Sequence, residues 1–263
     1  MMKLELTLLI LSFLLLVYYK IHLYDIKEGF DRHIREGKVT FYSKQAAQDL
    51  FKTDPDSYFE NLTELDKKAM NVKDTDDAIQ KMVNACMEFS TSDKIRLLKF
   101  TAEGDRFLRQ LKLPYVDTKK IANMDWNLVL TRDTANEEGM PHTKGDVIYL
   151  STIVLDMPTK ELIKTLIHEK VHVYERANPK LMKEWMKYKG YKLNRRQSEI
   201  KEARSNPDVD GWTYISPEGK ETVVLYRHSN PKTIEEANYP RYDDPSSEHP
   251  YEDLAYYVDS LYK

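Results

Sequence analysis

The chain has 263 residues, enough for one catalytic domain with an attached segment and a sizeable hydrophobic core. Hydrophobic residues make up 41% of the chain and charged residues 32%, with a formal net charge of -3. Acidic and basic residues are interspersed, so the basic field that nucleic acid requires is missing and we expect no nucleic-acid partner. Cys86 is the only cysteine, which excludes an intrachain disulfide and a small fold stapled by disulfides.

The N-terminus begins with an apolar run. Residues 6–19 carry no charge and are bounded by Glu5 and Lys20. About 20 apolar residues cross the core of a bilayer, and residues 1–23 approach that length if Lys3 and Lys20 extend to the headgroups. The run therefore predicts a transmembrane signal anchor over residues 1–23 and a single-pass membrane protein. The alternative is secretion after signal cleavage, although no small-residue cleavage site follows the run.

Residues 24–113 are predicted to form a stalk followed by a helical region. The predicted helices span residues 43–53, 62–70, 75–90 and 93–112, with Ser43 and Ser92 as N-caps. Cys86 lies on the apolar face of the third of these helices, where we expect a buried core thiol. Asn61 begins a glycosylation acceptor pattern, which matters only if this region is outside the cytoplasm.

From residue 114 onward the pattern predicts a catalytic domain that continues to residue 263. Strands are predicted over residues 126–131 and 146–151, helices over 159–178, 180–193 and 250–262, and a hairpin between 212–215 and 222–227. Thr159 is expected to cap the first of these helices. Two strands followed by helices predict an α+β fold with a small mixed sheet. An edge strand of that sheet is expected to be free to pair with an extended substrate.

His168-Glu169-Lys170-Val171-His172 is the most informative stretch of the chain. In a helix, a spacing of four residues places His168 and His172 on one face, with Glu169 beside them. Zinc binds neutral imidazole nitrogens, and a catalytic zinc site leaves one position open for water. The ion lowers the pKa of that water, and a nearby carboxylate can take its proton during attack on a carbonyl. The motif predicts Zn²⁺ as cofactor, His168 and His172 as ligands, Glu169 as general base and a polypeptide as substrate.

A third ligand must come from elsewhere in the fold. Positions 175 and 178 hold Glu and Asn, so the third histidine of the metzincin pattern is missing and a glutamate on a later helix is expected. Spacing favours Glu199 or Glu202, whereas helix character favours Glu252, because Pro250 can begin a helix there. From the residues alone, these three alternatives remain open.

The chain from Trp126 to Lys263 resembles gluzincin-type zinc metallopeptidases, most closely a set known from large DNA viruses of eukaryotes. The segments that carry the resemblance are Pro141-His142-Thr143, Val147–Ser151, Leu166–His172, Asn206-Pro207-Asp208 with Gly211 and Tyr214, and His249–Glu252 with Ala255-Tyr256. The resemblance implies a zincin-like catalytic domain with a small mixed sheet, an active-site helix and a glutamate helix, in which Glu252 is the third zinc ligand. It also implies that the protein is a hydrolase that cleaves peptide bonds and that its membrane belongs to a virion or to a host endomembrane.

Two further roles need residues near the metal. Asp253 is a candidate to orient His168 or His172 through the second ring nitrogen, or else a favourable charge in the first turn of its helix. A donor that stabilises the oxyanion of the reaction is also required. The eligible residues are Tyr251, His249, His228, Tyr256 and His142.

Two alternative functions compete with a peptidase. A non-catalytic membrane or virion structural protein could retain a zincin scaffold as an interaction module, and a binding protein could carry the motif without any metal. Glu169 argues against the first, because a structural zinc site gains nothing from a base beside it.

Overall fold

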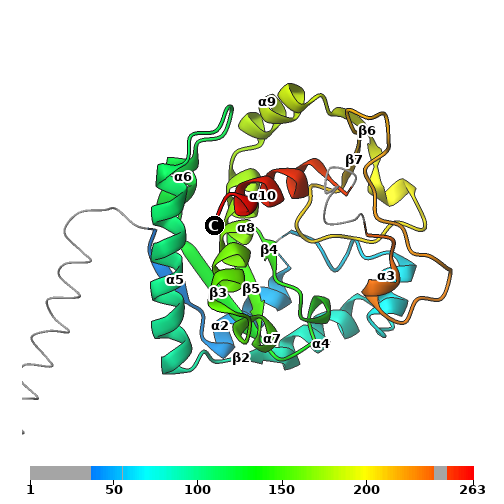
Figure 1. Ribbon diagram of the computed structural model, residues 1–263. Helices are drawn as coiled ribbons and strands as arrows, with labels where there is room; N and C mark the ends of the chain where they lie inside the picture. The colour runs from blue at the N-terminus through cyan, green and yellow to red at the C-terminus, as the bar shows by residue number, and fades with distance from the viewer. Residues whose placement is uncertain (1–36, 55, 240–247) are drawn as a thin grey trace, which may run out of the picture. The chain divides into compact units, whose positions relative to one another are not determined.

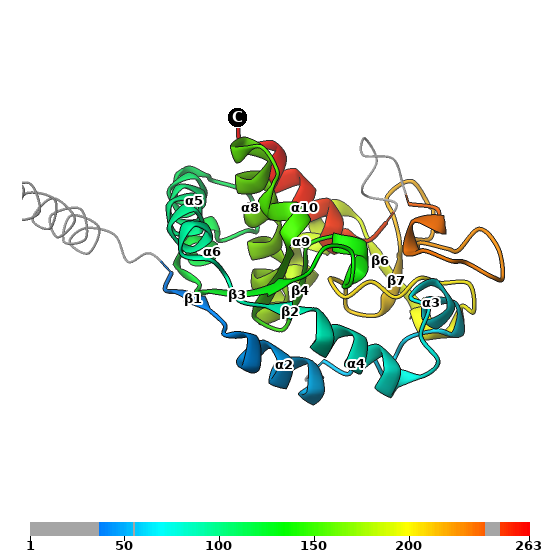
Figure 2. The ribbon, with the colours of Figure 1, turned by 90° about the horizontal axis from the view of Figure 1, so that it is seen from below.

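A five-stranded mixed sheet separates two groups of helices (Figures 1 and 2). The structure is a computed structural model that describes residues 37–54, 56–239 and 248–263. The strands are β1 (Val39–Phe41), β2 (Cys86–Met87), β3 (Trp126–Thr131), β4 (His142–Lys144) and β5 (Val147–Ser151). β1 and β5 pair in parallel with β3, β2 pairs antiparallel with β3, and β4 pairs antiparallel with β5 at one edge.

Each face of the sheet carries its own hydrophobic core. Side chains alternate along a strand, so Leu128 and Ile148 pack on one face while Val129 and Tyr149 pack on the other. The helices are α2 (Lys44–Thr53), α3 (Glu64–Ala69), α4 (Thr75–Ala85), α5 (Thr91–Gln110), α6 (Thr118–Asn123), α7 (Thr152–Leu155), α8 (Thr159–Ala177), α9 (Pro179–Lys189) and α10 (Pro250–Ser260). α8 packs against both α5 and α10 and lies between them in Figure 2, whereas α2 and α4 cover the opposite face. The described residues therefore form a mixed fold of the α+β kind.

The described part of the predicted stalk and helical region belongs to the same compact unit as the residues after 113. It contributes β1 and β2 to the sheet, and the chain from Gly37 to Lys263 clusters as one compact unit. The predicted anchor at residues 1–23 lies outside the described residues. Among the helices that are described, none has the length and the apolar character needed to cross a bilayer.

The helix predicted over residues 75–90 ends earlier than expected. α4 stops at Ala85, because Cys86 takes an extended conformation and pairs with Thr131 of β3. The expectation of a buried thiol is confirmed, and burial raises the pKa of Cys86 to about 11, which keeps the thiol unreactive.

The predicted helix caps are partly right. Ser43 caps α2 as predicted, but Ser90 rather than Ser92 caps α5. Thr159 is the first residue of α8 rather than its cap, and Pro158 precedes it without a capping hydrogen bond.

The segment after α8 also differs from the prediction. α9 ends at Lys189 because Gly190 adopts a left-handed conformation (φ 94°), and the next residues form strand β6 (Lys192–Arg196). β6 pairs antiparallel with β7 (Trp212–Ile215).

The hairpin predicted between residues 212–215 and 222–227 is confirmed only near its turn, where an antiparallel bridge joins Ile215 to Glu221, because Leu225 and Tyr226 bridge to Ala203 and Ala237 instead. The segment 222–227 keeps local contacts with the end of β7, including a hydrogen bond from Thr222 N to Tyr214 O of 2.7 Å.

Lys170 fixes the orientation of α8. It lies between the two histidines in sequence but points away from their face, and its side chain is fully buried. Its ammonium pairs with Asp105 of α5 and lies 4.1 Å from the ring centroid of Trp126. A buried charge is tolerated only with a partner, so the pair holds one rotational setting of the helix that carries the motif.

Asp105→Ala should destabilise the protein by about 3–5 kcal/mol, because it leaves the Lys170 ammonium buried without its partner. Asp105→Ala with Lys170→Met should recover most of this loss. Urea denaturation of the full chain measures both, and Asp49→Ala serves as a control, since the Asp49–Lys52 pair is exposed and should contribute about 0–1 kcal/mol. An unchanged free energy of unfolding in Asp105→Ala would contradict the assignment.

Candidate functional site

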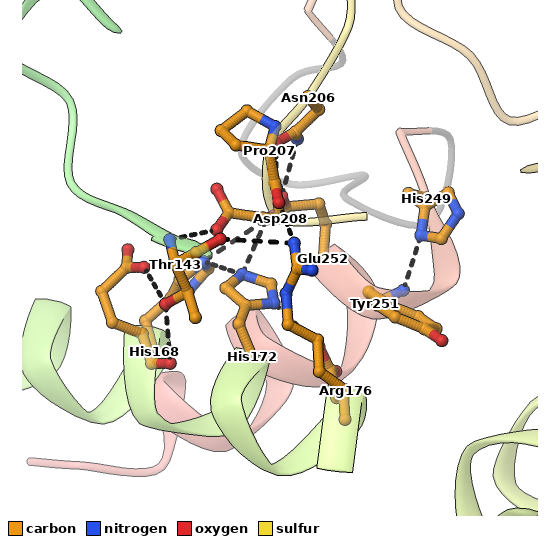
Figure 3. A network of polar contacts seen from close by, with 12 residues as sticks. Thr143, His168, His172, Arg176, Asn206, Pro207, Asp208, His249, Tyr251 and Glu252 are labelled. Atoms are coloured by element: carbon orange, nitrogen blue, oxygen red, sulfur yellow. Dashed lines mark hydrogen bonds and ion pairs between the residues drawn. The ribbon is translucent and has the colours of Figure 1, made fainter. Parts of the chain in front are cut away.

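Two helices bring the predicted ligands together. His168 and His172 lie on one face of α8, and α10 packs beside that face with Glu252 in its first turn (Figure 3). α10 begins where it does because Pro250 takes its first position and the His249 side chain accepts a hydrogen bond from Tyr251 N. This start places Glu252 opposite the two imidazoles.

The three side chains converge on one point. The Nε2 atoms of His168 and His172 are 3.1 Å apart, and Glu252 Oε2 lies 3.3 Å from the first and 3.7 Å from the second. Among the described residues, these three form a group that could hold a metal ion. Glu199 and Glu202 are exposed and lie outside the group.

The separations fit a small divalent cation. An ion bound tetrahedrally at about 2.0–2.1 Å from each ligand atom requires ligand atoms about 3.4 Å apart. The three distances here bracket that value. Two imidazole nitrogens and one carboxylate oxygen are also the donor set that zinc accepts in catalytic sites, with a further position left for water.

Each imidazole is held from behind by a carboxylate. Asp259 Oδ2 lies 2.9 Å from His168 Nδ1, and Glu175 Oε2 lies 2.8 Å from His172 Nδ1. A proton on each Nδ1 leaves the Nε2 lone pair available, which is the arrangement that metal-bound histidines normally require.

The orienting carboxylate is therefore not Asp253. The Asp253 carboxylate accepts a hydrogen bond from the Tyr191 hydroxyl and pairs with Lys189. Asp259 lies seven residues after Glu252, about two helical turns, and so shares its face of α10. Glu175 lies three residues after His172 and shares its face of α8 in the same way. Sequence reasoning missed both residues, although the helical spacing could have indicated them.

Glu169 lies beside the same group. Its side chain is 2% exposed, and its Oε2 accepts a hydrogen bond of 2.9 Å from the Thr143 hydroxyl on β4. Burial and the negative charge of Asp208 raise the pKa of Glu169 to about 8. A cation in the site would favour the ionised form of this carboxylate and bring its pKa back down.

A cavity of about 330 Å³ opens onto these residues. Its lining includes His168, Glu169 and Glu252, and its volume falls in the range of about 300–1,000 Å³ that is common for ligand pockets. The acids Asp208 and Glu248 also line it, and burial together with the charge of Glu252 raises the pKa of Glu248 to about 8. The cavity wall thus carries more carboxyl groups than basic side chains, and a bound cation would favour the ionised form of these carboxyl groups.

Of the five candidate oxyanion donors, two line the cavity. The ring of Tyr256 lies 4.6 Å from that of His168 between centroids. His142 stacks on Tyr149, and burial lowers the pKa of its imidazole to about 3, so the ring is neutral at pH 7.

The other three candidate donors lie away from the cavity. At the start of α10, the backbone N–H of Tyr251 donates to the His249 ring, to one side of His168, His172 and Glu252 (Figure 3). His228 pairs with Glu236 on the surface.

The edge strand β4 is not free as expected. The backbone N–H of Thr143 donates to Asp208 Oδ1 at 2.6 Å, and its carbonyl oxygen accepts from the Arg176 guanidinium at 3.3 Å. The next residue but one, Gly145, donates its N–H to Asp56 at 2.6 Å. Side chains therefore occupy the backbone groups that an extended substrate would pair with.

Zinc binding should release at least one proton at pH 7. Burial favours neutral imidazole, but the hydrogen bonds with Asp259 and Glu252 outweigh it and raise the pKa of His168 to about 10. Because the metal-free ring is protonated at pH 7 and the ligand must be neutral, binding displaces a proton and zinc affinity should fall as pH is lowered. Calorimetry in two buffers of different ionisation enthalpy measures the release, and equal binding heats in both would contradict it.

The site thus combines two oriented imidazoles, a carboxylate and a buried glutamate, and His168, Glu169 and Glu252 of this set line one cavity. No protein-family model matches this chain, and no curated protein or solved structure shows significant similarity to it.

Proposed function

We propose that the protein is a zinc-dependent peptidase of the gluzincin type, with a zincin-like catalytic domain. The observation that carries the proposal is the convergence of His168, His172 and Glu252, with ligand-atom separations of 3.1, 3.3 and 3.7 Å. Glu252 comes from a helix distant in sequence, so the motif alone does not account for the convergence. The order of edge strand, motif helix and glutamate helix supports the zincin-like assignment.

The chain's own residues divide the chemistry between them. His168, His172 and Glu252 would hold Zn²⁺, which lowers the pKa of a water molecule and polarises the substrate carbonyl when bound. Glu169 takes the proton of the attacking water, and the Thr143 hydroxyl holds its carboxylate for that transfer. Asp259 keeps His168 in its ligating orientation, as Glu175 does for His172.

Charge on the substrate oxygen needs a donor in the same cavity. Tyr256 and His142 both line it, but the single N–H of the neutral His142 ring donates to the Met140 carbonyl oxygen and its Nε2 accepts from the Asn136 amide. The Tyr256 hydroxyl is therefore the proposed donor to the developing oxyanion. The place of Tyr256 in the cavity wall, with its ring 4.6 Å from that of His168 between centroids, supports this role over the three candidates outside the cavity.

The proposal includes the N-terminus. Residues 1–23 would anchor the catalytic domain to a membrane as a single span, in a virion or a host endomembrane, and secretion after signal cleavage is the alternative. The substrate would then be a polypeptide that reaches the same membrane surface.

Zinc should bind stoichiometrically to the full-length protein, and His168→Ala or Glu252→Ala should abolish tight binding. Each substitution removes one of three ligands, so the remaining pair cannot complete the site. Elemental analysis after dialysis measures the zinc content. Glu199→Ala is the matched control, because Glu199 is exposed and should leave the content unchanged. Loss of zinc in Glu199→Ala with retention in Glu252→Ala would overturn the ligand assignment.

Glu169→Gln should keep its zinc and lose about 10²–10⁴-fold in the rate of peptide hydrolysis, because an amide cannot take the proton from water. A mixed peptide library analysed by mass spectrometry measures cleavage. Zinc-loaded protein that cleaves no peptide would favour the non-catalytic structural alternative. Cleavage at the wild-type rate by Glu169→Gln would show that another group acts as the base.

A further inference from the structure

The two carboxylate oxygens of Glu252 have different partners. Oε2 faces the imidazole nitrogens of His168 and His172, whereas Oε1 accepts a hydrogen bond of 2.9 Å from Asn206 Nδ2 (Figure 3). The proposed function uses the first oxygen and leaves the second unexplained. Asn206 lies in the Asn206-Pro207-Asp208 segment, in the loop that leads to β7.

The orientation of the Asn206 amide is fixed by its own loop. Its Oδ1 accepts a hydrogen bond of 2.8 Å from the backbone N–H of Asp208. A backbone N–H can only donate, so the amide oxygen must face Asp208 and the NH₂ group must face Glu252. A second hydrogen of that group points to Glu248 Oε1 at 3.3 Å.

The loop itself is tied to the elements that carry the motif. Asp208 Oδ1 accepts from the backbone N–H of Thr143 on β4, and Arg176 of α8 donates to the carbonyl oxygen of Pro207. The Thr143 hydroxyl in turn donates to Glu169. One loop therefore joins the glutamate of α10 to the strand and helix that position the base (Figure 3).

We propose that Asn206 is a positioning residue that holds Oε1 of Glu252, so that this carboxylate offers a single oxygen to the cation. A carboxylate released from this hydrogen bond can rotate and bind through both oxygens, which would raise the number of ligand atoms around the ion from four to five and crowd the position of the water. Asn206 thereby keeps the site open for a water molecule. The inference rests on the metal site of the proposed function and does not depend on the substrate.

Asn206→Ser in the full-length protein tests the proposal. The serine hydroxyl can still accept from the Asp208 N–H but does not reach Glu252. Zinc affinity, measured by competition with a chelator, should fall about 10–100-fold, the usual effect of losing a group that orients a ligand. Asn206→Gln, which keeps an amide donor, should recover part of the affinity.

Asn194→Ser is the matched control. Asn194 donates a hydrogen bond of 2.7 Å to Glu221, so the same substitution removes the same kind of contact far from the site. It should leave zinc affinity at the wild-type value, and unfolding of all three variants by urea identifies any general loss of structure.

The visible absorption of Co²⁺ bound in place of zinc is a second readout. It depends on the number of ligand atoms around the ion and does not change when a variant only lowers the stability of the fold. Four-coordinate Co²⁺ absorbs visible light more strongly than five-coordinate Co²⁺, so Asn206→Ser loaded with Co²⁺ should show a weaker band than the wild type. Wild-type affinity and an unchanged band in Asn206→Ser would overturn the inference. A wild-type protein that binds no zinc would overturn it together with the proposed function, whereas bound zinc without peptide cleavage would overturn only the peptidase assignment.

Discussion

The packing of α10 against α8 is the contact on which the site depends. Leu254, Ala255 and Val258 are fully buried in the core that α8 shares, and the small side chain of Ala255 allows close approach. Once the two helices lie together, Glu252 faces the imidazoles. Asp259 reaches His168 from the same helix. One hydrophobic contact thus sets both a ligand and the group that orients another ligand.

Local patterns were enough to predict the elements that carry this contact. The motif predicted which face of α8 carries the ligands. Pro250 and the apolar positions after it predicted a helix over residues 250–262, two residues longer than α10. The choice of Glu252 over Glu199 came from the resemblance, and the exposure of Glu199 now accords with it. The role of the group as a zinc centre, and the peptidase activity, stay predictions.

The parts that escaped prediction depend on tertiary neighbours. Asp253 and Asp259 are both acids on α10, but they lie on different faces of the helix. Asp259 shares the face of Glu252 and contacts His168, whereas Asp253 contacts Tyr191. Asn206 approaches Glu252 through a loop with no periodic pattern to read. Strand β6 is exposed along its whole length, so it lacks the alternation by which strands are recognised.

The side chains that occupy the edge of β4 also affect how the sheet meets other copies of itself. A strand edge with unpaired backbone groups can pair with the strand edge of another copy, and repeated pairing of this kind leads to aggregates. Here Asp56, Asp208 and Arg176 bind both backbone groups of Thr143 and the backbone N–H of Gly145, and two of the three bring negative charge to that edge. The side chains that close this edge to a peptide therefore also protect it against self-association of sheets.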